Sequence, residues 1–143
     1  MIVSPAMNES KLILVLGDQL SMNQPALKRA KRGRDVVLLA EVAEEATYVR
    51  HNRHKITLLF AAMRHFGLEL EALGHNVHYI AIDQGMASLE DAVRSVLEQT
   101  VTDEVIVCEP GEYRLVHQMR TSWSSSLGIP VTVLEDDRFL ASH

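Results

Sequence analysis

The sequence is poor in cysteine, and this limits the kind of protein it encodes. Its 143 residues include one cysteine, Cys108, so no disulfide forms within the chain, as is typical of reducing compartments. No apolar run approaches the roughly 20 residues that a membrane-spanning helix needs. Met1 to Ser10 lack the basic start and apolar centre of a signal peptide. We therefore expect a cytoplasmic protein without membrane contact, with residues 1–10 as a flexible N-terminal tail.

Several catalytic and cofactor-binding motifs are also missing. Gly17-Asp18 lacks the serine of an esterase motif, and no glycine-rich phosphate loop of the dinucleotide or P-loop type follows an apolar run. His51 and His54 lie three residues apart, but the histidines show no metal-binding spacing with cysteines or carboxylates. We therefore predict no catalytic residue and no metal site, and interpret Cys108 as a small apolar residue.

Positive charge is scarce, with 14 lysines and arginines against 19 acidic residues and a formal net charge of −5. Nucleic-acid affinity depends largely on neutralising phosphates, so this composition argues against a DNA-reading role. One basic cluster exists, formed by Lys28, Arg29, Lys31, Arg32 and Arg34. We interpret it as the solvated end of a helix, with DNA contact within a longer protein as the alternative.

Five short apolar runs are the main positive feature of the sequence. They lack the polar alternation of half-exposed strands, which is typical of parallel strands covered by helices on both faces. The runs are Lys11–Leu16, Asp35–Ala40, Val77–Ile82, Glu104–Cys108 and Val131–Leu134. Their regular spacing, and a hydrophobic content of 47%, indicate one domain with a substantial core.

Segments with helical periodicity separate these runs. We predict helices over Gln24–Lys31, His54–Leu73, Ser88–Gln99 (with Ser88 as N-cap) and Tyr113–Leu127. Right-handed crossovers then give a Rossmann-like, doubly wound α/β fold. Its parallel sheet is expected to have strand order 3-2-1-4-5, with the first strand in the centre. Only residues 135–143 follow the last strand, where a complete doubly wound domain usually adds a helix. We therefore interpret residues 11–143 as a domain that is truncated at its border with a second, missing domain.

Polar residues follow the predicted strands at the edge where open α/β sheets bind ligands. Carboxylates accept hydrogen bonds from ligand hydroxyls, and an amide both donates and accepts. The candidate binding residues of this edge are Gly17, Asp18, Gln19, Glu41, Glu44, Glu109 and Glu112.

Each candidate also has a simpler interpretation. Asp18 could cap the following helix while Gln19 faces solvent, and Glu44 could belong to a solvated acidic loop. Glu109 and Glu112 bracket a stiff Pro-Gly turn, but Glu112 could instead cap the helix that starts near Tyr113.

The segment from Tyr48 to Lys55 carries several cations near a predicted helix start, where they oppose the helix dipole. Nearby acids could offset them, or the segment could face an electron-rich ligand. We therefore include Tyr48, which could stack on a flat ring, Asn52 and Lys55 among the candidate pocket residues.

Five blocks of the sequence resemble a known family, and they occur in the family's order. They are Leu14–Leu20 (LVLGDQL), Glu41–Tyr48 (EVAEEATY), His54–Ile56 with Met63–Phe66 (MRHF), Glu109–Glu112 (EPGE) and Glu135–Leu140 (EDDRFL). Together they resemble the N-terminal domain of the deoxyribodipyrimidine photolyase-related proteins, bacterial photolyases and cryptochromes that carry an iron–sulfur cluster.

The resemblance implies an antenna domain that binds 6,7-dimethyl-8-ribityllumazine. FAD, the iron–sulfur cluster and the DNA-lesion pocket of the family belong to a following helical domain, which is absent here. The resemblance further implies that the chain alone is non-catalytic. It would contact damaged DNA only as part of a longer parent protein, which is a light-dependent lyase or a blue-light sensor. The alternative from the residues is a free-standing Rossmann-like module that binds a nucleotide or partner protein without photochemistry.

Overall fold

The strands form one five-stranded parallel sheet of order β3-β2-β1-β4-β5. The structure is a computed structural model. It describes residues 10–43 and 53–135, except for the side chains of residues 53 and 54. The strands are β1 (Lys11–Leu14), β2 (Val36–Ala40), β3 (Asn76–Ile80), β4 (Glu104–Cys108) and β5 (Val131–Leu134). The predicted order, direction and central first strand are confirmed.

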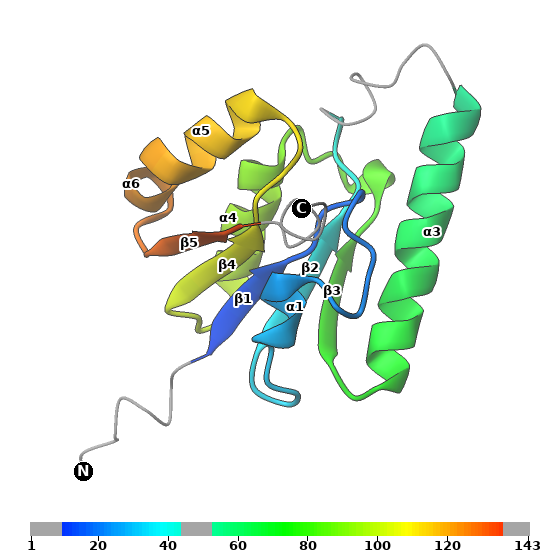
Figure 1. Cartoon of the computed structure of the whole chain (residues 1–143), viewed down its shortest axis with the longest axis horizontal. Helices are drawn as coiled ribbons and strands as arrows, with labels where there is room; N and C mark the ends of the chain where they lie inside the picture. The colour runs from blue at the N-terminus through cyan, green and yellow to red at the C-terminus, as the bar shows by residue number, and fades with distance from the viewer. Residues whose placement is uncertain (1–9, 44–52, 136–143) are drawn as a thin grey trace, which may run out of the picture.

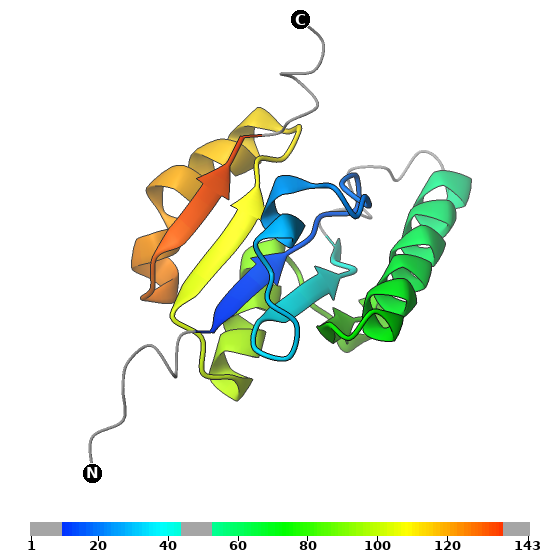
Figure 2. The same ribbon diagram turned by 60° about the horizontal axis from the view of Figure 1, so that its bottom comes forward.

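Helices cover both faces of the sheet, which confirms the doubly wound arrangement (Figure 1). They are α1 (Pro25–Lys28), α3 (Arg53–Ala72), the 3-10 turn η2 (Ile82–Gln84), α4 (Leu89–Gln99), α5 (Tyr113–Thr121) and α6 (Trp123–Leu127). The turned view in Figure 2 shows α1 over the centre of the sheet. α3 packs on the same face.

Alternate residues of β1 supply two separate cores, because successive side chains of a strand point to opposite faces. Leu12 and Leu14 face α4, α5 and α6, where Trp123 and Met119 are fully buried. Ile13 packs in the other core, which α1 and α3 cover. The uninterrupted apolar runs of the sequence follow from this burial on two sides.

Two of the predicted helices need correction. The first helix is short, ends at Lys28 and has Gln24 as its N-cap. The predicted single helix Tyr113–Leu127 is two helices, because it breaks at Ser122. At the break the hydroxyls of Thr121 and Ser122 donate to the carbonyls of His117 and Gln118. Such side-chain hydrogen bonds compete with and bend helices.

The predicted cap of α4 agrees with the structure. Ser88 accepts a hydrogen bond from the Asp91 N–H at 3.1 Å and begins α4 as predicted. Gly128 ends α6 with φ 80°, a conformation in which glycine has no steric penalty. The third predicted strand is displaced, because Ile82 belongs to η2 and the strand ends at Ile80.

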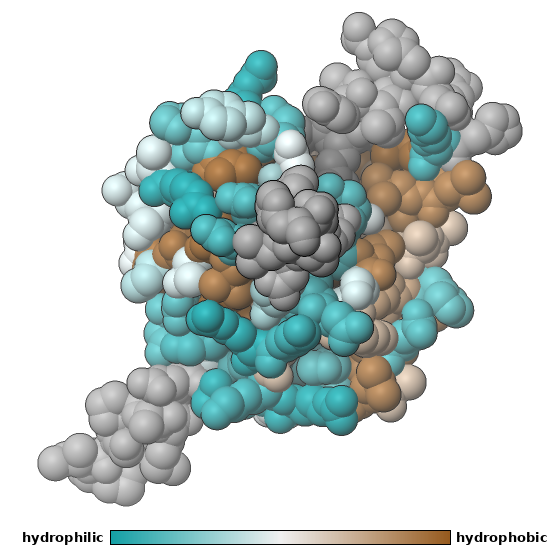
Figure 3. Space-filling view, in the orientation of Figure 1, coloured by the Kyte–Doolittle hydropathy of each residue, from teal (hydrophilic) through white to brown (hydrophobic). Residues whose placement is uncertain are grey.

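The outer face of α3 is unusually apolar. Leu58, Leu68 and Leu73 are 69%, 63% and 45% exposed, and Figure 3 shows hydrophobic surface along this helix. Leu73 is the last residue of the predicted helix, but it lies just beyond the end of α3 and is 45% exposed. Within the described residues, none of the helices is both long enough and apolar enough to cross a membrane.

Candidate functional site

Gln19 ties the carboxyl ends of β1 and β4 together. Its Nε2 donates to the carbonyl oxygens of Cys108 and Glu109, at 3.0 Å in each case. The side chain reaches them because Gln19 N–H bonds to Leu16 O at 2.9 Å and turns the chain sharply after the strand. Gln19 is only 4% exposed, and its Oε1 is buried without a hydrogen-bond partner among the described residues.

Asp18 and Gly111 lie opposite each other at the same edge. Asp18 is exposed, and a Cβ placed on Gly111 would lie 3.7 Å from its Oδ2. The turn after β4 therefore approaches the turn after β1, as the strand-end pattern predicts. The crevice-edge residues that the structure brings together are Asp18, Gln19 and Glu109, which we call the β1/β4 edge.

The simpler interpretations of Asp18 and Gln19 are wrong. Asp18 does not cap α1, because that helix begins at Pro25 and Gln24 Oε1 accepts its cap hydrogen bond from the Leu27 N–H. Gln19 does not face solvent, since it is buried between two strand ends. Both side chains therefore lie at the edge where open α/β sheets bind ligands.

Glu109 and Glu112 occupy different environments. The Glu109 N–H donates to Leu134 O at 2.7 Å, which fixes the residue to β5. Its carboxylate is 27% exposed and pairs with Arg120 at 3.2 Å. Glu112 is exposed and stands at the N-cap position of α5, but its side chain makes no cap hydrogen bond.

Gly17 is closely packed against α3. A Cβ at this position would lie 2.9 Å from Leu59 Cδ1 and 3.2 Å from Met63 Sδ, so α3 approaches the end of β1 closely. This contact gives a structural reason for the glycine that does not involve a ligand.

Glu41 is buried at the end of β2 with all its acceptor positions occupied. Oε1 accepts from Arg64 Nη2 at 2.8 Å and from the Ile82 N–H at 2.9 Å. Oε2 accepts from Arg64 Nε at 2.6 Å and from the Tyr79 hydroxyl. A carboxylate offers about four lone-pair sites, so Glu41 has none left for a ligand in this arrangement.

The charge of this cluster is stable near neutral pH. Burial opposes ionisation of Glu41, but the hydrogen bonds from Arg64, Tyr79 and Ile82 outweigh it and lower the pKa of the carboxyl group. Burial, followed by the hydrogen bond to Glu41, raises the pKa of the Tyr79 hydroxyl, so it stays protonated and donates.

Sequence analysis missed Arg64 and Tyr79. The signal in the sequence is a tyrosine inside an apolar strand, because a buried tyrosine hydroxyl usually needs a polar partner. The partner itself follows from the sheet order, which sets β3 beside β2 and so brings Tyr79 and Glu41 together.

Three candidates come from the segment that links β2 to α3, and a fourth comes from the start of α3. Glu44, Tyr48 and Asn52 lie outside the described residues. Lys55 is described, and it is exposed in the first turn of α3. In residues 10–43 and 53–135, no group of three or more histidine, cysteine, aspartate or glutamate side chains could hold a metal ion.

Comparisons with known proteins identify the family. The sequence model described as "Deoxyribodipyrimidine photo-lyase-related protein" matches residues 13–143. A protein of Agrobacterium fabrum (strain C58) named "(6-4) photolyase" is 39% identical over 136 residues. The match covers 94% of this chain but 27% of that relative, so the chain spans about a quarter of the relative's length. The chain belongs to the deoxyribodipyrimidine photolyase-related protein family.

Proposed function

We propose that the chain is a light-harvesting domain that binds 6,7-dimethyl-8-ribityllumazine at the β1/β4 edge. The observation that carries this proposal is Gln19 Oε1, a buried acceptor without a donor. Such an atom costs free energy unless a partner satisfies it. The ring N–H of a lumazine, or a ribityl hydroxyl, is a donor of the required kind.

The neighbouring groups suit the same ligand. The exposed carboxylate of Asp18 can accept from ribityl hydroxyls, and the carboxylate of Glu109 lies on the adjacent strand end. Gln19 is held rigidly by its two carbonyl partners, so it would orient the ring without losing further freedom. Glu41 then stabilises the neighbouring strand end instead of touching the pigment.

Light harvesting needs no acid–base group in this chain. The bound lumazine would absorb near-ultraviolet or blue light and pass excitation to a flavin. The chain's own residues bind and orient the pigment and keep water from its polar groups. We propose that FAD and an iron–sulfur cluster belong to the remainder of a longer protein, which acts in light-dependent DNA repair or blue-light sensing. The name of the relative supports the repair function.

Titration of the purified chain with ribityllumazine tests the proposal. Removing one polar partner should cost about 1 to 3 kcal/mol, or roughly five- to 150-fold in affinity. Asp18→Ala and Gln19→Leu should therefore weaken binding. The absorbance and fluorescence of the pigment measure the affinity. Glu98→Ala, at the exposed far end of α4, is the matched control and should bind normally.

Two outcomes would contradict the proposal. Full pigment affinity in both edge variants would place the pigment elsewhere. Absence of pigment binding by the unaltered chain, together with binding of a nucleotide, would favour the free-standing module without photochemistry.

A further inference from the structure

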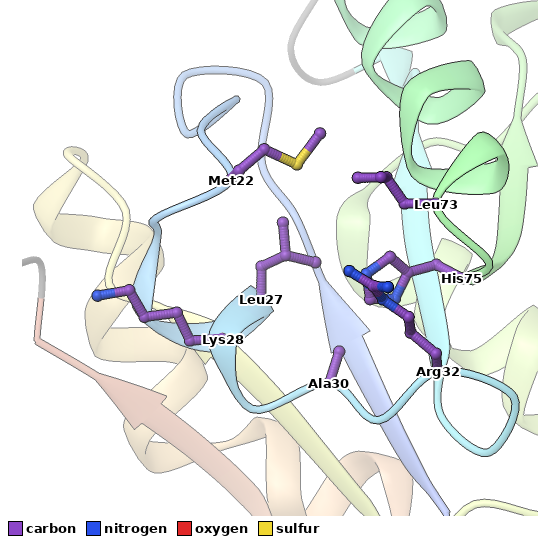
Figure 4. A pocket seen from close by; sticks show the side chains of 7 residues that line it. All are labelled: Met22, Leu27, Lys28, Ala30, Arg32, Leu73 and His75. Carbon is purple, nitrogen blue, oxygen red and sulfur yellow. The ribbon is translucent and has the colours of Figure 1, made fainter.

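A second candidate site lies at the opposite edge of the sheet. A pocket of about 250 Å³ opens between the turn after α1 and the end of α3. Its walls are the side chains labelled in Figure 4, namely Met22, Leu27, Lys28, Ala30, Arg32, Leu73 and His75. Arg32 precedes β2 and His75 precedes β3, so the pocket belongs to the amino ends of the strands. This pocket is therefore separate from the β1/β4 edge, where we propose that the pigment binds.

The cations around this pocket have no carboxylate partners. Across the described parts of the chain, no ion pair involves Lys28, Arg29, Lys31 or Arg32. Among the other arginines whose side chains the structure describes, four pair with carboxylates, namely Arg34, Arg64, Arg94 and Arg120. An uncompensated cluster is unexpected in a chain with a net charge of −5.

Asp35 fixes the shape of the basic turn without neutralising Arg32. This fully buried carboxylate accepts from the Lys31 N–H at 2.8 Å, the Lys11 N–H at 2.9 Å and Arg34 Nε at 3.1 Å. The turn is therefore held in place from below, while Lys28 and Arg32 stay exposed. Figure 3 shows hydrophilic surface over this turn at the bottom of the view. A ligand would meet cations that are already positioned.

His75 supplies an unsatisfied polar atom to the same pocket. Its Nδ1 is buried and has no hydrogen-bond partner in the part of the chain that the structure describes, although Arg32 lies close to the ring (Figure 4). Burial, followed by the positive charge of Arg32, lowers the pKa of His75, so the ring is neutral at pH 7. An anion that drew the flexible Arg32 side chain outward would expose Nδ1 to an acceptor.

We propose that this pocket is a phosphate-binding site, in which Arg32, Lys28 and His75 contact phosphoryl oxygens. Guanidinium, ammonium and imidazole groups together offer the several donors that a phosphate can accept, and arginine suits it in particular. Leu27 and Leu73 provide apolar walls for the organic part of a phosphate ester. The phosphate belongs either to a free ester or to a nucleic-acid backbone. In the second case, Arg29 and Lys31 would contact the neighbouring phosphates of the backbone.

The test follows the imidazole resonances of His75 by NMR, assigned with a His75→Gln variant. Inorganic phosphate should shift them in a saturable way, whereas chloride at equal ionic strength should not. Arg32→Gln should weaken the phosphate titration about tenfold or more, because a charge-assisted hydrogen bond is lost. Arg114→Gln removes an exposed cation from α5 and is the matched control. Unchanged melting temperatures would show that both variants fold.

A DNA duplex of arbitrary sequence distinguishes the two sources. If the backbone is the ligand, Arg32→Gln lowers the slope of log affinity against log salt by about 1 relative to the unaltered chain. If a free ester is the ligand, only the phosphate titration responds to Arg32→Gln. The proposal is overturned if chloride reproduces the phosphate shift, or if Arg114→Gln and Arg32→Gln have equal effects on both probes.

Discussion

The carboxylate of Glu41 and the guanidinium of Arg64 form a two-point ion pair, with contacts of 2.6 and 2.8 Å. Glu41 is fully buried at the end of β2, whereas the Arg64 side chain on α3 is 55% exposed. The pair therefore joins the sheet to the long helix at its outer edge. Because one partner is buried, the pair matters more for stability than a surface ion pair does.

Arg64→Gln should destabilise the chain. It leaves the buried carboxylate of Glu41 without its cationic partner. The loss is limited because the Arg64 side chain is half-exposed, and because Tyr79 and the Ile82 N–H still donate to Glu41. Urea unfolding measures the effect. Arg114→Gln should change stability by less than about 0.5 kcal/mol, and an equal loss in both variants would show that the ion pair contributes nothing specific.

The low pKa of Glu41 predicts acid-sensitive stability. A carboxyl group with a lower pKa in the folded state than in the unfolded state binds fewer protons when folded. Its contribution is present above the ordinary pKa of about 4.3 for a glutamate and is lost as the pH falls through the folded value. The free energy of unfolding should therefore drop more between pH 7 and pH 3 in the unaltered chain than in Glu41→Gln. Parallel pH curves for the two proteins would contradict this assignment.

Gly17→Ala should be destabilising although the change is small. The added methyl group would lie 2.9 Å from Leu59 Cδ1 and 3.2 Å from Met63 Sδ, so both side chains must move. Overpacking of this kind costs about 1 to 3 kcal/mol. Gly111→Ala is the control, because its nearest contact outside the turn is an ordinary 3.7 Å to Asp18 Oδ2. Chemical denaturation of both variants should rank Gly17→Ala as clearly less stable.

The sheet could be predicted from the sequence because its signal is strong at every strand. Runs such as Glu104–Cys108 are short, apolar and bounded by polar turns, and the structure reproduces that run with its predicted bounds. The strand order followed from crossover rules that leave few topologies for such a pattern. The division at Ser122 could not be predicted from apolar spacing alone, because Met119 and Trp123 keep the helical spacing across the break.

The site was harder to predict than the fold, for a physical reason. Strand-end position identifies which residues reach the binding edge, but it does not say what each side chain contacts there. Gln19 and Glu41 both follow a strand of the sheet, yet within the described residues Gln19 keeps an unpartnered oxygen and Glu41 keeps none. That difference depends on Arg64 and Tyr79, which come from elements distant in the sequence.

Gln19→Glu should destabilise the ligand-free chain more than Gln19→Leu does. Gln19 Nε2 donates to two carbonyl oxygens, and a glutamate would replace this donor by an acceptor facing the same two oxygens. Leaving buried groups unsatisfied costs about 1 to 3 kcal/mol each, whereas leucine at least avoids the repulsion. We expect a loss of at least about 2 kcal/mol in Gln19→Glu, measured by urea unfolding at pH 7. Gln118→Glu, on the exposed side of α5, makes the same chemical change without buried partners and should be nearly neutral. If Gln19→Glu proved as stable as the unaltered chain, the amide would not be what holds the ends of β1 and β4 together.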